Sequence, residues 1–385
     1  MSSSTAKTCL EASRVDPVIP HGKRPVVCLN ISESRTRNFI RELERRGFVA
    51  LEFQTGTASS VFRQLWQFIR AARKADFILC GGPLRSQILW LLTAKLLRVP
   101  SAVDSPMDCT EWPFATAWHC RWGVRGVLKL ADYVLTLKSR AYFVDKFGLR
   151  EERVLFLENC PDRFRVESSV EEATPRFRPR PNSFLFCCSG CHAAHRLERF
   201  MPTFEALLAR IPNAELLLIG DPEQATIIES KRYAEANGFA DRVHTLPVIR
   251  PAEDFFATIA QCHMWVATLA DNTLQGRHEF RMELLEVGLL AKPVIAVQTP
   301  GLIENGLSDE RELIFIDPAN PEASAEKIAH YVHDSRLLAE LGGRLRACVI
   351  ERFSLGDAVD HLLRSVSGNH RNQRSSELIE SGQSK

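Results

Sequence analysis

The sequence has no apolar run of the roughly 18 to 20 residues that are needed to span a bilayer. Its longest apolar stretch, residues 88–97, is interrupted by Lys95 and is typical of a buried helix. The first 24 residues lack the apolar region of a secretory signal, so we expect a cytoplasmic protein. Its eleven cysteines are therefore expected to be thiols, because disulfides rarely persist in a reducing compartment.

Several common functional motifs are also missing. No Gly-x-Gly-x-x-Gly follows the first predicted strand and no Walker loop occurs, which argues against a dinucleotide enzyme and a P-loop NTPase. No Gly-x-Ser-x-Gly elbow supports a serine hydrolase. The chain also has no recognised nucleic-acid-binding module, so no nucleic-acid partner is expected.

One short run suggests a metal or haem site. Residues 188–192, Cys-Ser-Gly-Cys-His, match the pattern for covalent haem attachment, and Cys187 and His195 lie close enough to suggest zinc. Haem attachment needs export, which the N-terminus does not support. Structural zinc sites usually draw a second pair of ligands, which the sequence does not show. We therefore predict no metal and no cofactor in this run.

The residues that are present are typical of a globular α/β protein. At 385 residues, with 45% hydrophobic and 25% charged residues, the chain suits two domains of roughly 150 to 170 residues each. Apolar strand patterns alternate with helical patterns, which predicts βαβ units and parallel sheets. The predicted strands are residues 25–30, 49–53, 76–80, 100–104, 133–137, 154–157, 184–187, 214–219, 243–246, 264–268 and 294–296.

The two halves are separated by a segment of linker composition and carry opposite charge. Residues 166–181 contain prolines and many charges without sustained periodicity, so we predict a linker there. Residues 23–162 have 22 Lys and Arg against 14 Asp and Glu, whereas residues 182–350 have 15 against 23. A balance of +8 in the first half favours an anionic partner, such as a membrane surface or a lipid-linked phosphate, although an ordinary solvated surface fits equally well.

A stretch near residue 280 carries the strongest indication of function. Residues 277–296 read RHEFRMELLEVGLLAKPVIA, an irregular loop followed by an acidic helix and an apolar strand. Glu279 and Glu286 are seven residues apart and would project from one helical face. The start of a helix binds phosphate through its unpaired N–H groups. Carboxylates beside such a helix start suit a nucleotide-diphosphate sugar.

This stretch resembles the donor-site signature of GT4 glycosyltransferases of the GT-B fold. Leu285-Glu286-Val287 takes the place of the family's Leu-Glu-Ala, and residues 291–296, Ala-Lys-Pro-Val-Ile-Ala, match its Gly-x-Pro-Val-Val-Ala. Counting back eight residues from Glu286 reaches His278, with Glu279 one place later. The first family glutamate is thus replaced by His278 or shifted to Glu279.

Other segments follow the same family in order and spacing. Residues 131–139, ADYVLTLKS, resemble its Ala-Asp-x-Val-x-x-x-Ser, and residues 211–220, IPNAELLLIG, resemble its Pro-x-x-x-Leu-x-Ile-Val-Gly. The resemblance covers roughly residues 24–366. It implies two Rossmann-like domains, an acceptor domain at 24–165 and a donor domain at 182–350, with residues 351–366 as a helix that returns to the first domain. The ends, residues 1–23 and 367–385, are predicted to be disordered.

The resemblance also implies roles for individual residues. Glu286 would bind the nucleotide ribose, and Glu279 or His278 the sugar hydroxyls. Gly190 and Arg196 match the glycine and the lysine of the family's phosphate loop, whereas Cys191 replaces its arginine. The leaving diphosphate would be stabilised by Arg196, by the backbone near Phe280, Arg281 and Met282, and by Arg277.

On the acceptor side the indications are weaker. Asp104, Asp108 and Glu111 come at the end of a predicted strand, where open α/β sheets bind ligands, although a plain loop fits them equally well. Arg35 follows the first strand, where the family usually has Gly-Gly. If the basic first half contacts a membrane, the first candidates are Arg35, Arg37, Arg41, Arg45 and Arg46, because spacings of four place several of them on one helical face.

We therefore predict a retaining, metal-independent glycosyltransferase. Its partners would be a nucleotide-sugar donor and a saccharide or lipid-linked acceptor in polysaccharide or glycolipid synthesis. It would be cytoplasmic or held peripherally on the inner face of the membrane. Two alternatives are a non-catalytic binding or scaffold protein of GT-B fold and a nucleotide-sugar epimerase.

Overall fold

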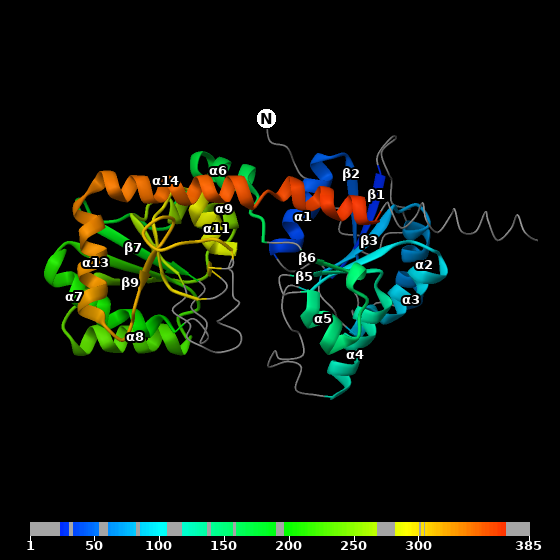
Figure 1. The fold of residues 1–385 in the computed structure, drawn as a ribbon, viewed down its shortest axis with the longest axis horizontal. Helices are drawn as coiled ribbons and strands as arrows, with labels where there is room; N and C mark the ends of the chain where they lie inside the picture. Colours follow the sequence, from blue (N-terminus) through cyan, green and yellow to red (C-terminus); the bar gives the residue numbers. More distant parts are fainter. Residues whose placement is uncertain are drawn as a thin grey trace, which may run out of the picture. The chain divides into compact units, whose positions relative to one another are not determined.

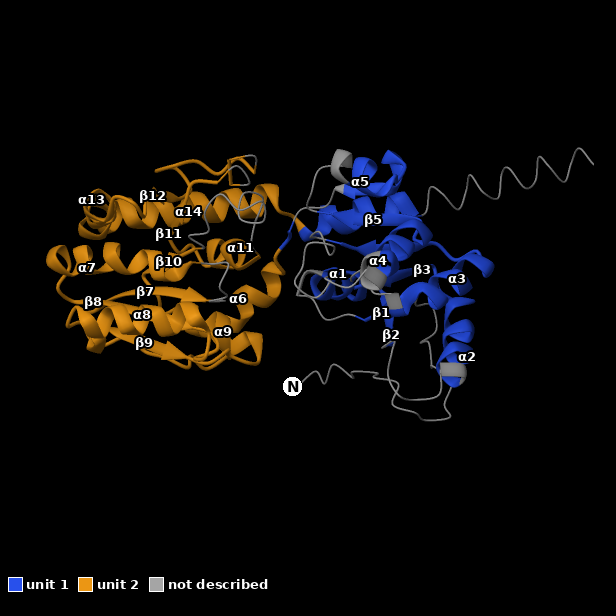
Figure 2. Ribbon diagram, turned by 90° about the horizontal axis from the view of Figure 1, so that it is seen from below, with its two compact units in different colours: residues 1–160, 355–385 blue, residues 161–354 orange. Residues whose placement is uncertain are grey.

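The fold consists of two compact units, each built on a six-stranded parallel sheet. The computed structural model describes residues 24–30, 34–53, 61–81, 85–105, 118–136, 140–156, 159–189, 196–267, 282–299, 302–303 and 305–366. One unit comprises residues 1–160 and 355–385, and the other comprises residues 161–354 (Figure 2). All strand pairs in both sheets are parallel, so the predicted α/β class is confirmed. The predicted disordered ends, residues 1–23 and 367–385, lie outside the described residues.

The first sheet has the strand order β2-β1-β3-β4-β5-β6. Its strands are β1 Arg24–Leu29, β2 Phe48–Phe53, β3 Phe77–Cys80, β4 Ser101–Asp104, β5 Tyr133–Thr136 and β6 Val154–Phe156. Their apolar runs are buried on both faces, as expected for a parallel sheet between two helical layers. Burial also raises the pKa of the thiols of Cys28 and Cys80 in this sheet, so both are held as neutral core residues.

Helices cover both faces of this sheet (Figure 1). One face is packed against α2 Val61–Ala72, α3 Ile88–Leu96, α4 Trp118–Leu130 and α5 Arg140–Phe147. The other face is packed against α1 Ser34–Arg45 and a helix over residues 355–366. That last helix buries Val359 and Leu362 against Val26 and Phe39, so the chain returns to its first unit at the end.

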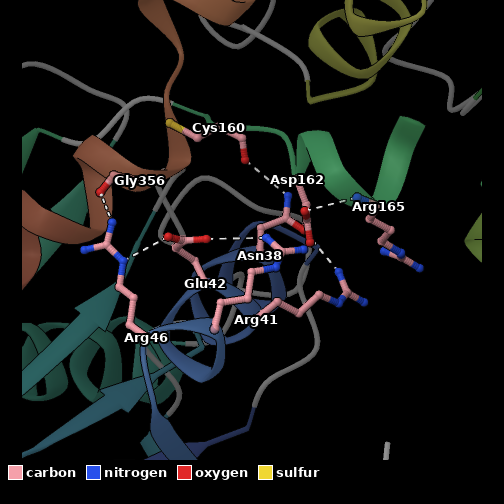
Figure 3. A network of polar contacts seen from close by, with 9 residues as sticks. Asn38, Arg41, Glu42, Arg46, Cys160, Asp162, Arg165 and Gly356 are labelled. Atoms are coloured by element: carbon pink, nitrogen blue, oxygen red, sulfur yellow. Dashed lines mark hydrogen bonds and ion pairs between the residues drawn. The ribbon is translucent and has the colours of Figure 1, made fainter. Parts of the chain in front are cut away.

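Polar contacts hold the returning helix to α1 (Figure 3). Arg46 donates to Glu42 Oε1 and to the Gly356 carbonyl, both at 2.9 Å, and also pairs with Asp360. The hydrogen bond from Arg46 holds the pKa of Asp360 below its usual value. Asn38 Nδ2 donates to the Cys160 carbonyl at 3.2 Å, which fixes α1 to the segment that ends the first part of this unit.

The second sheet has the order β12-β11-β10-β7-β8-β9. Its strands are β7 Phe184–Ser189, β8 Ala214–Ile219, β9 Val243–Leu246, β10 Met264–Val266, β11 Val294–Val297 and β12 Ile314–Ile316. One face is covered by α7 Met201–Arg210, α8 Ala225–Ala236 and α13 Pro321–His333. The other is covered by α6 Arg163–Glu172, α9 Ala252–Ile259, α11 Met282–Leu289 and α14 Ser335–Arg352.

The linker that we predicted at residues 166–181 has a different structure. Residues 163–172 form α6, whose Val166 is fully buried in the second unit. The segment is held by three arginines that pair with acids of α9 and β8: Arg165 with Glu253 at 2.7 Å, Arg176 with Asp254 at 2.5 Å, and Arg180 with Glu215 at 3.1 Å. The charges that gave it linker composition are therefore partners of the second unit, which begins at residue 161 and extends to residue 354.

His263, which immediately precedes β10, is expected to make the stability of the fold depend on pH. His263 Nδ1 accepts the Leu185 backbone N–H at 2.9 Å, and burial followed by the charge of Lys292 lowers the pKa of this imidazole. The folded state favours neutral His263, whereas the unfolded state takes up a proton below about pH 6.5. Stability is thus fully present above that pH and falls as the pH decreases through it.

Chemical denaturation between about pH 8 and pH 5.5 checks this prediction. Protonation of His263 should lower the free energy of unfolding by at most about 1.4 kcal/mol per pH unit. His263→Asn, which retains an acceptor but does not titrate, should flatten the decline. An unchanged slope in the variant would show that other groups cause the decline.

Candidate functional site

The second sheet reverses its strand order between β7 and β10. From β7 the chain proceeds through β8 to β9 on one side, and β10, β11 and β12 then continue on the other side. The register pairs Met264 with Phe186 and Trp265 with Cys187, so the carboxyl ends of β7 and β10 lie side by side. Open α/β sheets bind ligands at such a reversal, beyond the carboxyl ends of the strands. This edge is the candidate donor site.

Two predicted site segments begin at this edge. Residues 190–195 follow β7 and residues 268–281 follow β10, and both segments lie outside the described residues. They contain most of the residues that were predicted for the donor site, namely Gly190, Arg277, His278, Glu279, Phe280 and Arg281. Three predicted site residues are described: Met282 and Glu286 on α11, and Arg196 after the segment that follows β7.

The helix α11 presents Glu286 at its partly exposed side. Met282, Leu285, Val287 and Leu289 are buried against the sheet and α14, whereas Glu283 and Glu286 keep partial exposure. Met282 is the first residue of the helix, so the backbone N–H groups of its first turn have no partner within the helix. A carboxylate one turn from such a helix start can accept hydrogen bonds from hydroxyl groups while the N–H groups face an anion.

The position of α11 is fixed by close contacts with α14. A Cβ added at Gly288 would meet Val349 Cγ2 at 2.9 Å and Leu345 Cγ at 3.1 Å. A Cβ added at Gly342 would overlap the Ala291 carbonyl oxygen. Ala291, which stands where the GT4 signature has glycine, adopts a φ of 53°, a conformation that favours glycine. The signature thus encodes a sharp left-handed turn that ends α11 against α14.

Arg196 lies at the other side of the candidate site, immediately before the short 3₁₀ helix η5 Leu197–Phe200. Its side chain is about half exposed, and Nε pairs with Glu198 Oε1 at 2.5 Å. Glu198 Oε2 accepts the hydroxyl of Thr226 at 3.0 Å, at the start of α8. The sequence analysis did not predict Glu198. A bound diphosphate would compete with Glu198 for the Arg196 guanidinium.

In the first unit, Asp104 ends β4 at the carboxyl edge of its sheet. Its side chain is fully buried, and Oδ2 accepts the Thr36 hydroxyl of α1 at 2.8 Å. Ser105 and Thr136 are buried beside the same strand ends. A fixed carboxylate at this edge suits a hydroxylated ligand. The sequence analysis did not predict Thr36, because no local sequence pattern marks it. Asp108, Glu111 and the Arg35 side chain lie outside the described residues.

The described residues give no indication of a metal centre. Within the part of the chain that the structure describes, no group of three or more His, Cys, Asp and Glu is placed to hold an ion. Cys187 and Cys188 are buried, and Cys191, His192 and His195 lie outside the described ranges. Among the described helices, none is long and apolar enough to cross a membrane.

Comparisons with known proteins agree with this architecture. Residues 181–334 match the family model of Glycosyl transferases group 1. No curated protein sequence matches the chain. A solved structure of Anabaena HepE in complex with UDP and glucose is similar over 90% of this chain and 100% of its own, at 16% identity and a TM-score of 0.65.

Two further solved structures resemble the chain over most of their length. A glycosyltransferase from Rickettsia africae is 12% identical, with 90% of this chain and 99% of that chain covered and a TM-score of 0.63. Sucrose-phosphate synthase from Thermosynechococcus elongatus is 14% identical, with 92% and 100% covered and a TM-score of 0.58. These structures confirm the predicted GT-B fold, and residues 181–334 are similar to the Glycosyl transferases group 1 family.

Proposed function

We propose that this protein transfers a sugar from a nucleotide-diphosphate sugar to a hydroxyl acceptor, with retention of configuration and without a metal ion. The observation that carries the proposal is the position of Glu286. It lies partly exposed on α11, which starts at the reversal point of the second sheet, within the residues that match the glycosyltransferase family model. The solved HepE complex, which contains UDP and glucose, supports a uridine nucleotide as the first donor to test.

On this proposal the donor is held by charge and by hydrogen bonds. Glu286 accepts hydrogen bonds from the nucleotide ribose, and His278 or Glu279 holds hydroxyls of the sugar. Arg196, Arg277 and the first N–H groups of α11 stabilise the diphosphate as its bond to the anomeric carbon breaks. Glu198 keeps the Arg196 guanidinium in place until the diphosphate binds. The acceptor hydroxyl oxygen then forms its bond to the anomeric carbon on the face that the diphosphate leaves, and the hydroxyl proton passes to the departing phosphate oxygen.

The first unit would bind the acceptor. Asp104 is a fixed, buried carboxylate at the carboxyl edge of the first sheet. In the sequence, Asp108 and Glu111 follow β4, and Arg35 follows β1. A saccharide offers hydroxyls to such carboxylates, and a lipid-linked phosphate offers a negative charge to the basic half of the chain. A role in polysaccharide or glycolipid synthesis follows from either acceptor.

A second candidate is a nucleotide-sugar-binding protein without turnover. It is favoured by the ion pair between Arg196 and Glu198, which engages the cation that would neutralise the leaving diphosphate. It is also favoured by Cys191, which replaces the family arginine. In this case the site would bind the donor but would give the departing phosphate little stabilisation.

Thermal-shift measurements with UDP-, GDP- and ADP-sugars, followed by assays of nucleoside diphosphate release with saccharide and lipid acceptors, test the proposal. We expect one donor to raise the unfolding temperature and to release its nucleotide, with and without a chelator. Binding without release would establish the second candidate instead. Release that requires an added divalent ion would overturn the metal-independent mechanism, and no response to any donor would overturn both candidates.

A further inference from the structure

The outer side of α2, α3 and α4 carries large apolar side chains. These three helices pack on the same face of the first sheet through buried residues that include Phe68, Leu91 and Val127 (Figure 1). The opposite side of each helix is exposed. The large apolar residues on it are Trp66, Leu89, Leu92, Leu96 and Trp122, and their exposure reaches 84% at Leu96 and 72% at Trp122. Exposed apolar residues gathered on one face often mark an interaction site.

These residues are spaced so that each helix presents them together. Leu89, Leu92 and Leu96 follow one another at intervals of three and four residues, so they form a stripe along α3. The helices are also neighbours: α3 contacts both α2 and α4, and Gly126 of α4 lies against Ile88 of α3. The exposed sides therefore form one continuous face, which we call the α2–α4 face.

The charge on this face is mainly positive, although Asp76 follows α2, and Asp132, which follows α4, pairs with Lys95 at 3.7 Å. None of the three helices contains an aspartate or a glutamate in its sequence. The exposed basic residues on the helices and in the turns that follow them are Arg63, Arg70, Arg73, Lys74, Lys95, Arg98, Arg125 and Lys129. The Arg70 guanidinium lies 4.2 Å from the centre of the Trp66 ring, so a cation and an exposed aromatic ring occupy the same spot.

The predicted basic surface on α1 differs from the α2–α4 face, because several of its arginines pair with acids, and membrane contact there stays a prediction. Arg37 pairs with Glu52 at 2.5 Å, and Arg45 pairs with Glu42 at 3.4 Å. Arg46 is engaged by Glu42 and Asp360, and Arg41 donates to Asn38 at 3.2 Å. Arg37, Arg45 and Arg46 therefore share their charge with carboxylates inside the unit. The side chain of Arg35 lies outside the described residues.

We propose that the α2–α4 face docks the protein peripherally on an anionic lipid bilayer. Leucine and tryptophan side chains enter the boundary between headgroups and acyl chains, while arginine and lysine bind lipid phosphates. A second copy of this chain is disfavoured as the occupant because it would bring two faces of the same positive charge together. Nucleic acid would match the charge but would leave the leucine stripe of α3 without a role. This surface lies in the first unit and is independent of the proposed sugar transfer.

Flotation of the full chain with vesicles tests the proposal. We expect binding to phosphatidylcholine vesicles that contain phosphatidylglycerol, and weak binding to phosphatidylcholine alone. Binding should decrease steeply between about 0.1 M and about 1 M salt, because the Debye length falls from roughly 10 Å to 3 Å. Vesicle binding that ignores both phosphatidylglycerol and salt would overturn the proposal, as would no binding at all.

Two sets of variants separate the contribution of the exposed leucines to vesicle binding from that of the basic residues. Leu92→Gln combined with Leu96→Gln should reduce vesicle partitioning at least about tenfold, because it removes two exposed leucines that insert into the bilayer. Arg63→Gln, Arg70→Gln and Arg125→Gln together should reduce it by roughly fivefold per residue and flatten the salt dependence. At high salt only the apolar contribution to vesicle binding remains, so only the leucine variant should still reduce partitioning. Equal reductions in the leucine and arginine variants at high salt would contradict this assignment.

Matched controls lie on the second unit. Val248→Gln with Ile228→Gln removes two exposed apolar side chains, and Arg178→Gln, Lys231→Gln and Arg232→Gln remove three exposed cations. Both controls should bind vesicles like the wild type. All variants should retain the thermal shift with nucleotide sugar, which separates loss of docking from failure of the donor site.

A further test uses variants that keep an aromatic ring at both positions. It measures the quenching of tryptophan fluorescence by vesicles with brominated acyl chains. The quenching should decrease when Trp66 and Trp122 are replaced by phenylalanine, because these rings would lie closest to the acyl chains. Quenching that is unchanged in this variant would overturn the proposal. So would a dimer that the leucine variant dissociates, or preferential binding of nucleic acid over vesicles.

Discussion

Glu286→Gln is expected to weaken the binding of the nucleotide-sugar donor by roughly tenfold to a hundredfold, since hydrogen bonds to a charged group contribute about 1.5 to 3 kcal/mol. The substitution keeps the shape of the side chain and its partial exposure on α11, and it removes only the charge. Isothermal titration calorimetry with the donor that gives the largest thermal shift measures the effect. Turnover at a saturating donor concentration should change less than the affinity, because the ribose is distant from the bond that breaks.

Glu283→Gln is the matched control, because Glu283 is the other partly exposed acid of the same helix. It should leave donor affinity within about twofold of the wild type, as expected for a surface charge without a bound partner. If both variants lose affinity equally, the effect comes from the net charge of the helix. If Glu286→Gln alone retains full affinity in a folded protein, Glu286 is not in the site.

Gly342→Ala should destabilise the second unit by about 3 kcal/mol, because the added methyl group meets a backbone atom that has little room to move. A Cβ at this position overlaps the Ala291 carbonyl oxygen and also lies 3.3 Å from Pro293 Cδ. To accept it, α14 must shift away from the turn that ends α11. Donor affinity should therefore decrease together with stability, although residue 342 is not one of the residues predicted for the site.

The neighbouring glycine is a sensitive control for this prediction. A Cβ added at Gly343 has no atom within 4 Å, so Gly343→Ala replaces an exposed glycine in a helix without a clash. It should stabilise the helix by up to about 1 kcal/mol. The two adjacent substitutions are thus expected to have opposite signs in urea denaturation. The same sign in both would show that α14 does not pack on residue 291 in solution.

The strands were predictable because their apolar runs are short, continuous and bounded by turns. The predicted residues 214–219 and 243–246 coincide with β8 and β9, and most other strands begin and end within one or two residues of their predicted bounds. Parallel strands that are buried on both faces give this strong signal. β12 was not predicted, although it lies in the short apolar run of residues 313–316.

Some helices were missed because tertiary contacts stabilise them. α4 contains two glycines and several aromatic residues, yet it forms because Val124, Val127 and Leu128 are buried on the first sheet. α6 reads as a charged linker because its partners lie on α9 and α14, far away in the sequence. Glu167 of α6, for example, pairs with Arg346 of α14 at 2.6 Å.

The site was predictable only as far as local spacing determines it. The sequence places Glu286 on a helix because residues 282–290 are apolar at helical intervals, and the structure has α11 there. No local pattern pairs Arg196 with Glu198, or Asp104 with Thr36, which is 68 residues away in the chain. Likewise, the arginines of α1 form a basic stripe in sequence, but their charge is shared with Glu42, Glu52 and Asp360 once the unit folds.

Hydrogen–deuterium exchange of the full chain with and without nucleotide sugar tests the central claim most directly, namely that the donor binds at the carboxyl edge of the second sheet through α11. The account predicts slower exchange in peptides that cover residues 282–289 and 196–200, and unchanged exchange in α13 and at β9, which lie away from the reversal point. Protection confined to the first unit, or spread evenly over the second, would contradict it.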